Sequence, residues 1–253
     1  MIVAWLVLPA LLVGLSLGVG LLVESLAGRR LPGELLLPAG LAGIVVAGQA
    51  TASFDPTAEL TTPLIVALAL GGLAAALRRH RRLRSNLAAT LACLFCGLVF
   101  AAPVIASGEP TFGGYIRLDD TSTWLALTDR IIEHGRSLEG LAPSSYEATL
   151  AFNLGDGYPI GVFVPLGVGG ELTGADTARL IQPYMSVLAA FLALALIPLA
   201  RRLAGSQGRA AMIAAIAAQP ALLVGYVQGG GINEGAAAML VALAAALAVR
   251  CAR

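Results

Sequence analysis

The sequence predicts an all-α, polytopic membrane protein with about seven transmembrane helices and amphipathic interfacial helices in a long outer loop. Three observations carry this prediction. Apolar residues make up 58% of the chain and charged residues only 12%, about half the charged share of a soluble domain. Several apolar runs reach the roughly 20 residues that a helix needs to cross the hydrocarbon core. Arginine-rich and acidic links alternate between these runs, as in a chain that crosses a membrane repeatedly.

Apolar runs bounded by charge predict seven spans in order along the chain. They are residues 2–26, 35–53, 60–77, 86–106, 177–200, 209–227 and 232–249. The chain is therefore divided into four membrane helices over 1–106, an outer loop with surface helices over 107–176, and three further membrane helices over 177–253.

The links predict the orientation of the chain. All 16 basic residues are arginine, and 12 of them fall in alternate links on one side. Thirteen of the 15 acids fall on the other side, and only Glu24 and Glu34 lie near the arginines. Because basic residues are retained in the cytoplasm, we expect a multi-pass protein of the cell membrane with its N-terminus and long loop outside and its C-terminus cytoplasmic.

The outer loop is far longer than a connection needs, and its centre is amphipathic. Apolar residues from Trp124 to Ile132 recur at helical spacing, which predicts a helix over 121–134 lying on the membrane with its apolar face toward the lipid. Asp120 precedes it at the N-cap position, and Gly135 follows as a stop. Residues 158–173 are apolar but too short to span the bilayer, so they predict a second helix lying in the outer interface or dipping into it.

Asp119 and Asp120 are the first candidates for chemistry, because the positive end of the following helix favours anions. Adjacent carboxylates can hold a divalent metal ion such as Mg²⁺ or Mn²⁺, or one of them can act as a general base. The alternative is structural: one aspartate caps the helix, while the other is solvated or pairs with Arg117.

Further motifs follow these aspartates in a fixed order. After Asp119-Asp120, Trp124 and Gly135 come Tyr158-Pro159, then Ala178-Arg179-Leu180 opening a span, and then Arg201-Arg202-Leu203-Ala204-Gly205 closing it. Over about 117–250 the chain resembles the N-terminal half of a GT-C superfamily glycosyltransferase. That group includes protein mannosyltransferases and aminoarabinose transferases, which take sugars from polyprenyl-phosphate carriers.

The resemblance implies a cell-envelope enzyme that moves a sugar from a polyprenyl-phosphate donor to an acceptor on the extracytoplasmic face. It implies that a first-loop aspartate is the general base, in some members with a metal ion. The distance to Gly135 favours Asp120 over Asp119 for this role. Thr121 replaces the next family acid and Tyr158 replaces the family lysine, so phosphate binding would fall to Arg117 or to residues beyond this chain.

Other candidate substrate contacts lie in the outer links. Glu234 corresponds to a family acid that faces the same cavity, although an acid at a span's outer end is also an ordinary interfacial charge. Asn233 and Gln228, in the same turn, are further candidates for sugar contact. Arg179 can meet a phosphate or pair with a neighbouring acid, and Asp156 can line the same cleft.

The alternative function is a non-catalytic or accessory membrane protein, or a transporter. Transporters place ionisable residues near the middle of the bilayer, whereas the predicted spans are almost free of charge. This argues against ion-coupled transport. The cluster Arg78–Arg84 is expected to contact anionic membrane lipids, and we expect no nucleic-acid partner.

Overall fold

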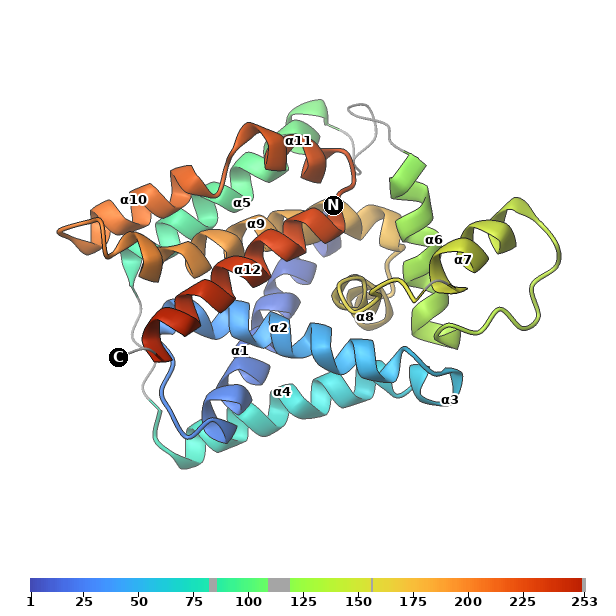
Figure 1. Cartoon of the computed structure of the whole chain (residues 1–253), viewed down its shortest axis with the longest axis horizontal. Helices are drawn as coiled ribbons and strands as arrows, with labels where there is room; N and C mark the ends of the chain where they lie inside the picture. Colours follow the sequence, from blue (N-terminus) through green and yellow to red (C-terminus); the bar gives the residue numbers. More distant parts are fainter. Residues whose placement is uncertain (82–85, 109–118, 156, 252–253) are drawn as a thin grey trace.

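A computed structural model describes residues 1–81, 86–108, 119–155 and 157–251, without the side chains of Asp119 and Asp120. Every regular element in these ranges is a helix, which confirms the predicted all-α class (Figure 1). A turn of π-helix over Val3–Val7 opens the chain. The helices that follow are α1 (Leu8–Leu26), α2 (Gly33–Thr51), α3 (Asp55–Ala58), α4 (Thr61–Arg78), α5 (Leu87–Ser107), α6 (Asp119–His134), α7 (Ser145–Gly155), α8 (Val164–Thr173), α9 (Thr177–Ala200), α10 (Gln207–Ala217), α11 (Ala221–Gln228) and α12 (Ile232–Cys251).

In the described ranges, six helical segments are long and apolar enough to cross a membrane, and a bent helix pair raises the number to as many as seven. The six are Val3–Leu26, Gly33–Thr51, Asp55–Arg78, Leu87–Ser107, Thr177–Ala200 and Ile232–Cys251. The pair is α10 and α11, which meet at 58°. Pro220 lacks an amide hydrogen and disfavours helix at the preceding residue, so the predicted span 209–227 is divided there.

The helices α1, α2 and α4 pack on one another through glycines. A Cβ on Gly40 of α2 would lie 1.6 Å from the carbonyl oxygen of Ser16 in α1, and one on Gly72 of α4 would lie 1.9 Å from that of Gly18. The backbones therefore touch at both crossings. Small residues that permit such close approach are the usual basis of helix association in lipid.

Helix α9 is the centre of the second half of the protein and is almost wholly buried. The helices α5, α10 and α12 pack around it, and α2 and α8 reach it from the other side (Figure 1). Buried apolar residues of these helices form one continuous cluster with those of α1. The two halves consequently share a core.

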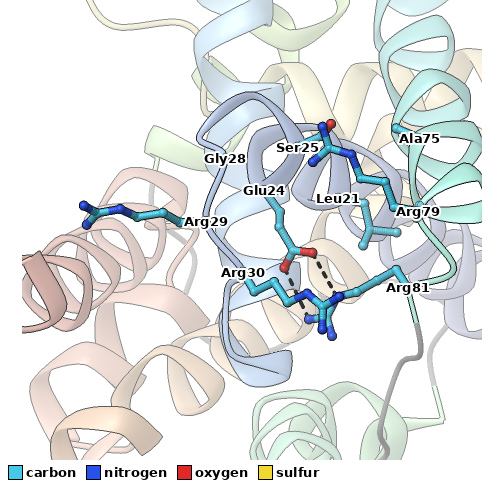
Figure 2. Close-up of a pocket in the computed structure, with 10 residues that line it drawn as sticks. Leu21, Glu24, Ser25, Gly28, Arg29, Arg30, Ala75, Arg79 and Arg81 are labelled. Atoms are coloured by element: carbon cyan, nitrogen blue, oxygen red, sulfur yellow. Dashed lines mark hydrogen bonds and ion pairs between the residues drawn. The ribbon is translucent and has the colours of Figure 1, made fainter.

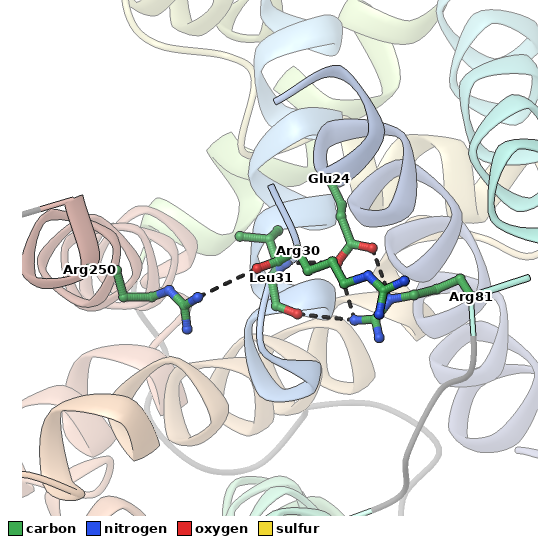
Figure 3. Close-up of polar contacts among 5 residues, drawn as sticks. All are labelled: Glu24, Arg30, Leu31, Arg81 and Arg250. Carbon is green, nitrogen blue, oxygen red and sulfur yellow. Dashed lines mark hydrogen bonds and ion pairs between the residues drawn. The ribbon is translucent and has the colours of Figure 1, made fainter. Parts of the chain in front are cut away.

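The arginine-rich links meet at one end of the bundle, where Glu24 is enclosed. Its carboxylate accepts hydrogen bonds from Arg81 Nε at 2.9 Å and Nη2 at 3.2 Å, and from the Leu31 amide at 2.7 Å. Arg81 also donates to the Leu31 carbonyl oxygen at 3.1 Å. Figures 2 and 3 show this ion pair between the end of α1 and the segment after α4.

The same end holds a second ion pair, between Glu34 at the start of α2 and Arg201 at the end of α9. Arg250 of α12 donates to the carbonyl oxygen of Arg30 at 3.5 Å (Figure 3). Both acids that the sequence placed near the arginines are therefore neutralised by an arginine of another helix. These contacts place the four arginine-rich parts of the chain at one end.

Breaking the first of these pairs should destabilise the fold. The side chains of Arg81 and Glu24 are only 16% and 10% exposed, so Glu24→Gln leaves a poorly solvated cation and is expected to lower the free energy of unfolding by about 3 kcal/mol. The double variant Glu24→Gln/Arg81→Gln should cost less than the sum of the two single changes. Detergent-induced unfolding measures both, with exposed Glu59→Gln as the control. Strict additivity would contradict the coupling.

Helix α6 confirms the helix predicted over 121–134, but it begins at Asp119, so Asp120 lies in its first turn rather than before it. Gly135, with a φ of +57°, ends it as predicted. Its apolar face does not rest on lipid as expected: Trp124 and Leu127 are buried, because α3, α7 and α8 cover that face. In Figure 1, α6 and α7 form the end of the molecule opposite the arginine-rich links.

The segment 158–173 is helical only from Val164 to Thr173. As predicted, it is not among the candidate spans. Helix α8 is enclosed by α2, α6 and α9, however, and its first six residues are buried, so protein rather than lipid covers them. Helix α7 was not predicted.

Candidate active site

The first turn of α6 lies against the turn between α11 and α12. The Thr121 hydroxyl donates to the carbonyl oxygen of Gly229 at 3.2 Å. Gly230 has a φ of +101°, and a Cβ there would lie 2.1 Å from Thr121 Oγ1, so only glycine fits this position. Asp119 and Asp120 directly precede Thr121 in the same helical turn. Their backbone therefore lies beside the α11–α12 turn.

Tyr158 connects α6 to the first turn of α12. Its hydroxyl oxygen accepts a hydrogen bond from Asn233 Nδ2. Its ring stacks on Trp124 of α6 with centroids 5.2 Å apart, and Trp124 stacks on Phe163 at 5.3 Å. The predicted candidate Tyr158 thus meets both segments that carry predicted acids.

Two polar side chains hold the backbone around Tyr158. Arg136 donates to the carbonyl oxygens of Leu154, at 2.9 Å, and of Tyr158. Gln49 Oε1 in α2 accepts from both amides of Ile160–Gly161, at 2.9 and 2.8 Å. Sequence reasoning missed Arg136 and Gln49, because neither belongs to a motif and each acts on backbone atoms remote in the chain.

Glu234 lies in the first turn of α12 and is exposed. Its Oε2 lies 2.8 Å from the point where a Cβ on Gly231 would stand, so the carboxylate folds back over the turn that contacts α6. The backbone thus brings together three predicted candidates at one end of the bundle: the start of α6 with its two aspartates, Tyr158, and Glu234.

Gln228, a candidate for sugar contact, is part of a buried hydrogen-bond network. It is buried, its Nε2 donates to the carbonyl oxygen of Phe100 at 2.9 Å, and its Oε1 accepts from Gln182 at 3.1 Å. The amide therefore anchors the end of α11 to α5 and α9. This network uses one amide hydrogen and the amide oxygen of Gln228.

The remaining candidates are not brought to this place by described contacts. Arg179, exposed in the first turn of α9, lines a different cavity with Met1 and Asp176. Within the described part of the chain it forms no ion pair with Asp176, only a backbone hydrogen bond at 2.9 Å. Arg117 and Asp156 lie outside the described residues.

An acidic cavity lies between α6, α8 and the start of α9. Asp129 Oδ1 accepts a hydrogen bond from Thr177 at 2.8 Å. Burial raises the pKa of Asp129, the Thr177 hydrogen bond partly lowers it, and the charges of Asp176 and Glu133 raise it further.

The raised pKa predicts a pH-dependent contribution to stability. Because folded Asp129 holds its proton more tightly than the unfolded chain does, its ionised form costs stability, and this cost appears as the pH rises through the raised pKa. Asp129→Asn is expected to stabilise the protein at neutral pH by about 0.5 kcal/mol, since solvent screens the half-exposed site. The gain should vanish in acid. Thermal unfolding of both proteins at acidic and at neutral pH checks this, with Glu147→Gln as the control. A wild type that is more stable than Asp129→Asn at neutral pH would contradict it.

Among the described side chains, no group of three or more His, Cys, Asp or Glu residues is placed so that it could hold a metal ion. The predicted metal ligands Asp119 and Asp120 have no described side chains. No family model matches the chain, and no similar curated protein or solved structure was found. The function must therefore be inferred from the site.

Proposed function

We propose that this polytopic membrane protein is a glycosyltransferase that moves a sugar from a polyprenyl-phosphate donor to an acceptor at the end of the bundle carrying α6. The observation that carries the proposal is the meeting of the start of α6, Tyr158 and the first turn of α12. The order of the motifs in the sequence independently predicts that these segments form one site.

Asp120 is the proposed general base, and Asp119 is its alternative. As the acceptor oxygen forms its bond to the anomeric carbon, its proton passes to the carboxylate. The bond between that carbon and the phosphate oxygen breaks, and polyprenyl phosphate leaves with the electron pair. Arg117, two residues before α6, is the proposed partner of the leaving phosphate. No step is assigned to a metal ion.

Tyr158 and Glu234 are the proposed sugar contacts. The Tyr158 hydroxyl is hydrogen-bonded to Asn233, the residue before Glu234, and hydroxyl and carboxylate groups suit the many hydroxyls of a sugar. A shallow cleft of about 510 Å³ between α6 and α7 adjoins Trp124, and hydroxyl, amide and aromatic groups line it. We assign the acceptor to this cleft, whose lining includes Ser145, Thr149 and Asn153.

A transporter is less consistent with the spans. Every Asp, Glu and Arg of the described spans lies close to a span end, and the two buried acids among them, Glu24 and Glu34, are paired with arginines. Ion-coupled transport usually needs ionisable groups near the bilayer centre. Asp156, if it lines the cleft beside Tyr158, and Arg179 remain predictions for substrate contact.

The proposal is tested with purified protein in lipid nanodiscs and a polyprenyl-phosphate sugar labelled in the sugar. With envelope lipids added as acceptors, the protein should consume the donor and release unlabelled polyprenyl phosphate, whereas empty nanodiscs should not. Donor consumption equal to that of empty nanodiscs across mannose, aminoarabinose and glucose donors would favour the non-catalytic alternative.

A further inference from the structure

The arginine-rich end carries a cavity that the proposed sugar transfer does not use. It has a volume of about 370 Å³ and lies between the end of α1, the link to α2 and the end of α4 (Figure 2). Four arginines line it together with Glu24: they are Arg29, Arg30, Arg79 and Arg81. The lining therefore has a formal charge of about +3.

Glu24 cannot neutralise this excess. Both of its oxygens already accept hydrogen bonds from Arg81, and one also accepts from a backbone amide. Among the described residues, Arg30 and Arg79 have no carboxylate within ion-pair distance. Figures 2 and 3 both show the Arg30 side chain reaching toward Glu24 and Arg81. Like charges brought together in this way call for an anion.

The surroundings of the cavity point to an amphiphile. The cavity lies where two candidate spans end, at Leu26 and Arg78, and lipid headgroups occupy this level of a bilayer. Leu26 and Leu77, next in sequence to lining residues, are 79% and 78% exposed. Cationic groups at the mouth of an apolar surface match a headgroup phosphate with its acyl chains.

We propose that this cavity binds the phosphate of an anionic membrane lipid. Arg30 and Arg79 bind the phosphate oxygens, because a guanidinium offers paired donors that fit them. The Glu24–Arg81 pair closes the base of the site and orients the link that carries Arg30. The acyl chains lie along Leu26 and Leu77. This inference is independent of the proposed sugar transfer.

Native mass spectrometry of the detergent-purified full chain tests the proposal, with phosphatidylglycerol and phosphatidylcholine as titrants. The wild type should bind one phosphatidylglycerol selectively. Each basic residue near a headgroup contributes about fivefold to binding, so Arg30→Gln/Arg79→Gln should weaken it by roughly 30-fold. The control Arg202→Gln/Arg209→Gln removes the same charge from exposed positions near the same end that do not line this cavity, and its binding should be nearly unchanged.

Equal weakening by both double variants would overturn the site in favour of a diffuse charge effect. Displacement of the bound lipid by millimolar inorganic phosphate, or equal binding of phosphate alone, would overturn the lipid as the ligand. Should Arg30→Gln/Arg79→Gln fail to fold, Arg30→Lys/Arg79→Lys keeps the charge and removes the paired donors of each guanidinium. It should bind severalfold more weakly than wild type, and unchanged binding would overturn the assigned phosphate contacts.

Discussion

Asp120→Asn is expected to reduce sugar transfer by a factor of 100 to 10,000, the contribution that a positioned general base usually makes. The amide has nearly the same shape as the carboxylate but cannot take the acceptor's proton. Because Asp120 lies in the first turn of a helix whose apolar face is buried elsewhere along it, the fold should persist. Donor consumption in nanodiscs measures the loss, and thermal unfolding verifies the fold.

The matched control is Glu133→Gln, near the other end of the same helix. The Glu133 side chain is 73% exposed. It should leave turnover unchanged. Asp119→Asn separates the two adjacent candidates: a larger loss in this variant than in Asp120→Asn would transfer the role of base to Asp119. Full turnover in both aspartate variants would exclude this part of α6 from the chemistry.

Gly72→Leu is expected to disrupt the packing of α4 on α1. A side chain at Gly72 would meet backbone atoms of Gly18 and Leu22, at 1.9 and 2.7 Å from its Cβ. Backbone cannot turn aside as a side chain does, so the loss should exceed the roughly 1–3 kcal/mol usual for overpacking. Detergent-induced unfolding and gel filtration measure it, and Gly72→Ala provides a milder step.

The neighbouring residue provides the control for this change. Gly71 is in the same helix, but nothing lies within 4 Å of a Cβ placed there. Gly71→Leu gains the same helix propensity and should be tolerated. Comparable stability of the two leucine variants would show that α4 does not cross α1 at Gly72.

Hydropathy and charge predicted most of the fold, because the bilayer requires long apolar helices and separates arginine from acid. Two details of the fold were not predicted. The periodicity of α6 shows that one face is apolar, but lipid and protein cover such a face equally well. The break at Pro220 is visible in the sequence, yet the apolar run continues past it, so one span was predicted.

The site was predicted less completely than the fold. The order of motifs assigned Asp120, Tyr158 and Glu234 to outer segments, which is as far as topology leads. The hydrogen bond between Tyr158 and Asn233 joins residues 75 positions apart, and no local pattern encodes such a distance. For the same reason the sequence could not tell that Arg179 lines a different cavity.

The bend between α10 and α11 changes the depth of the turn that contacts α6. A helix of 8 residues is roughly 12 Å long, but when tilted by 58° it advances only about 6 Å along the axis of α10. With α10 aligned along the bilayer normal, the turn after α11 would be about 6 Å nearer the bilayer centre than a straight helix would bring it. That difference is close to the thickness of one headgroup layer. A lipid-linked donor would therefore reach this turn sideways from its own leaflet, without rising out of the membrane.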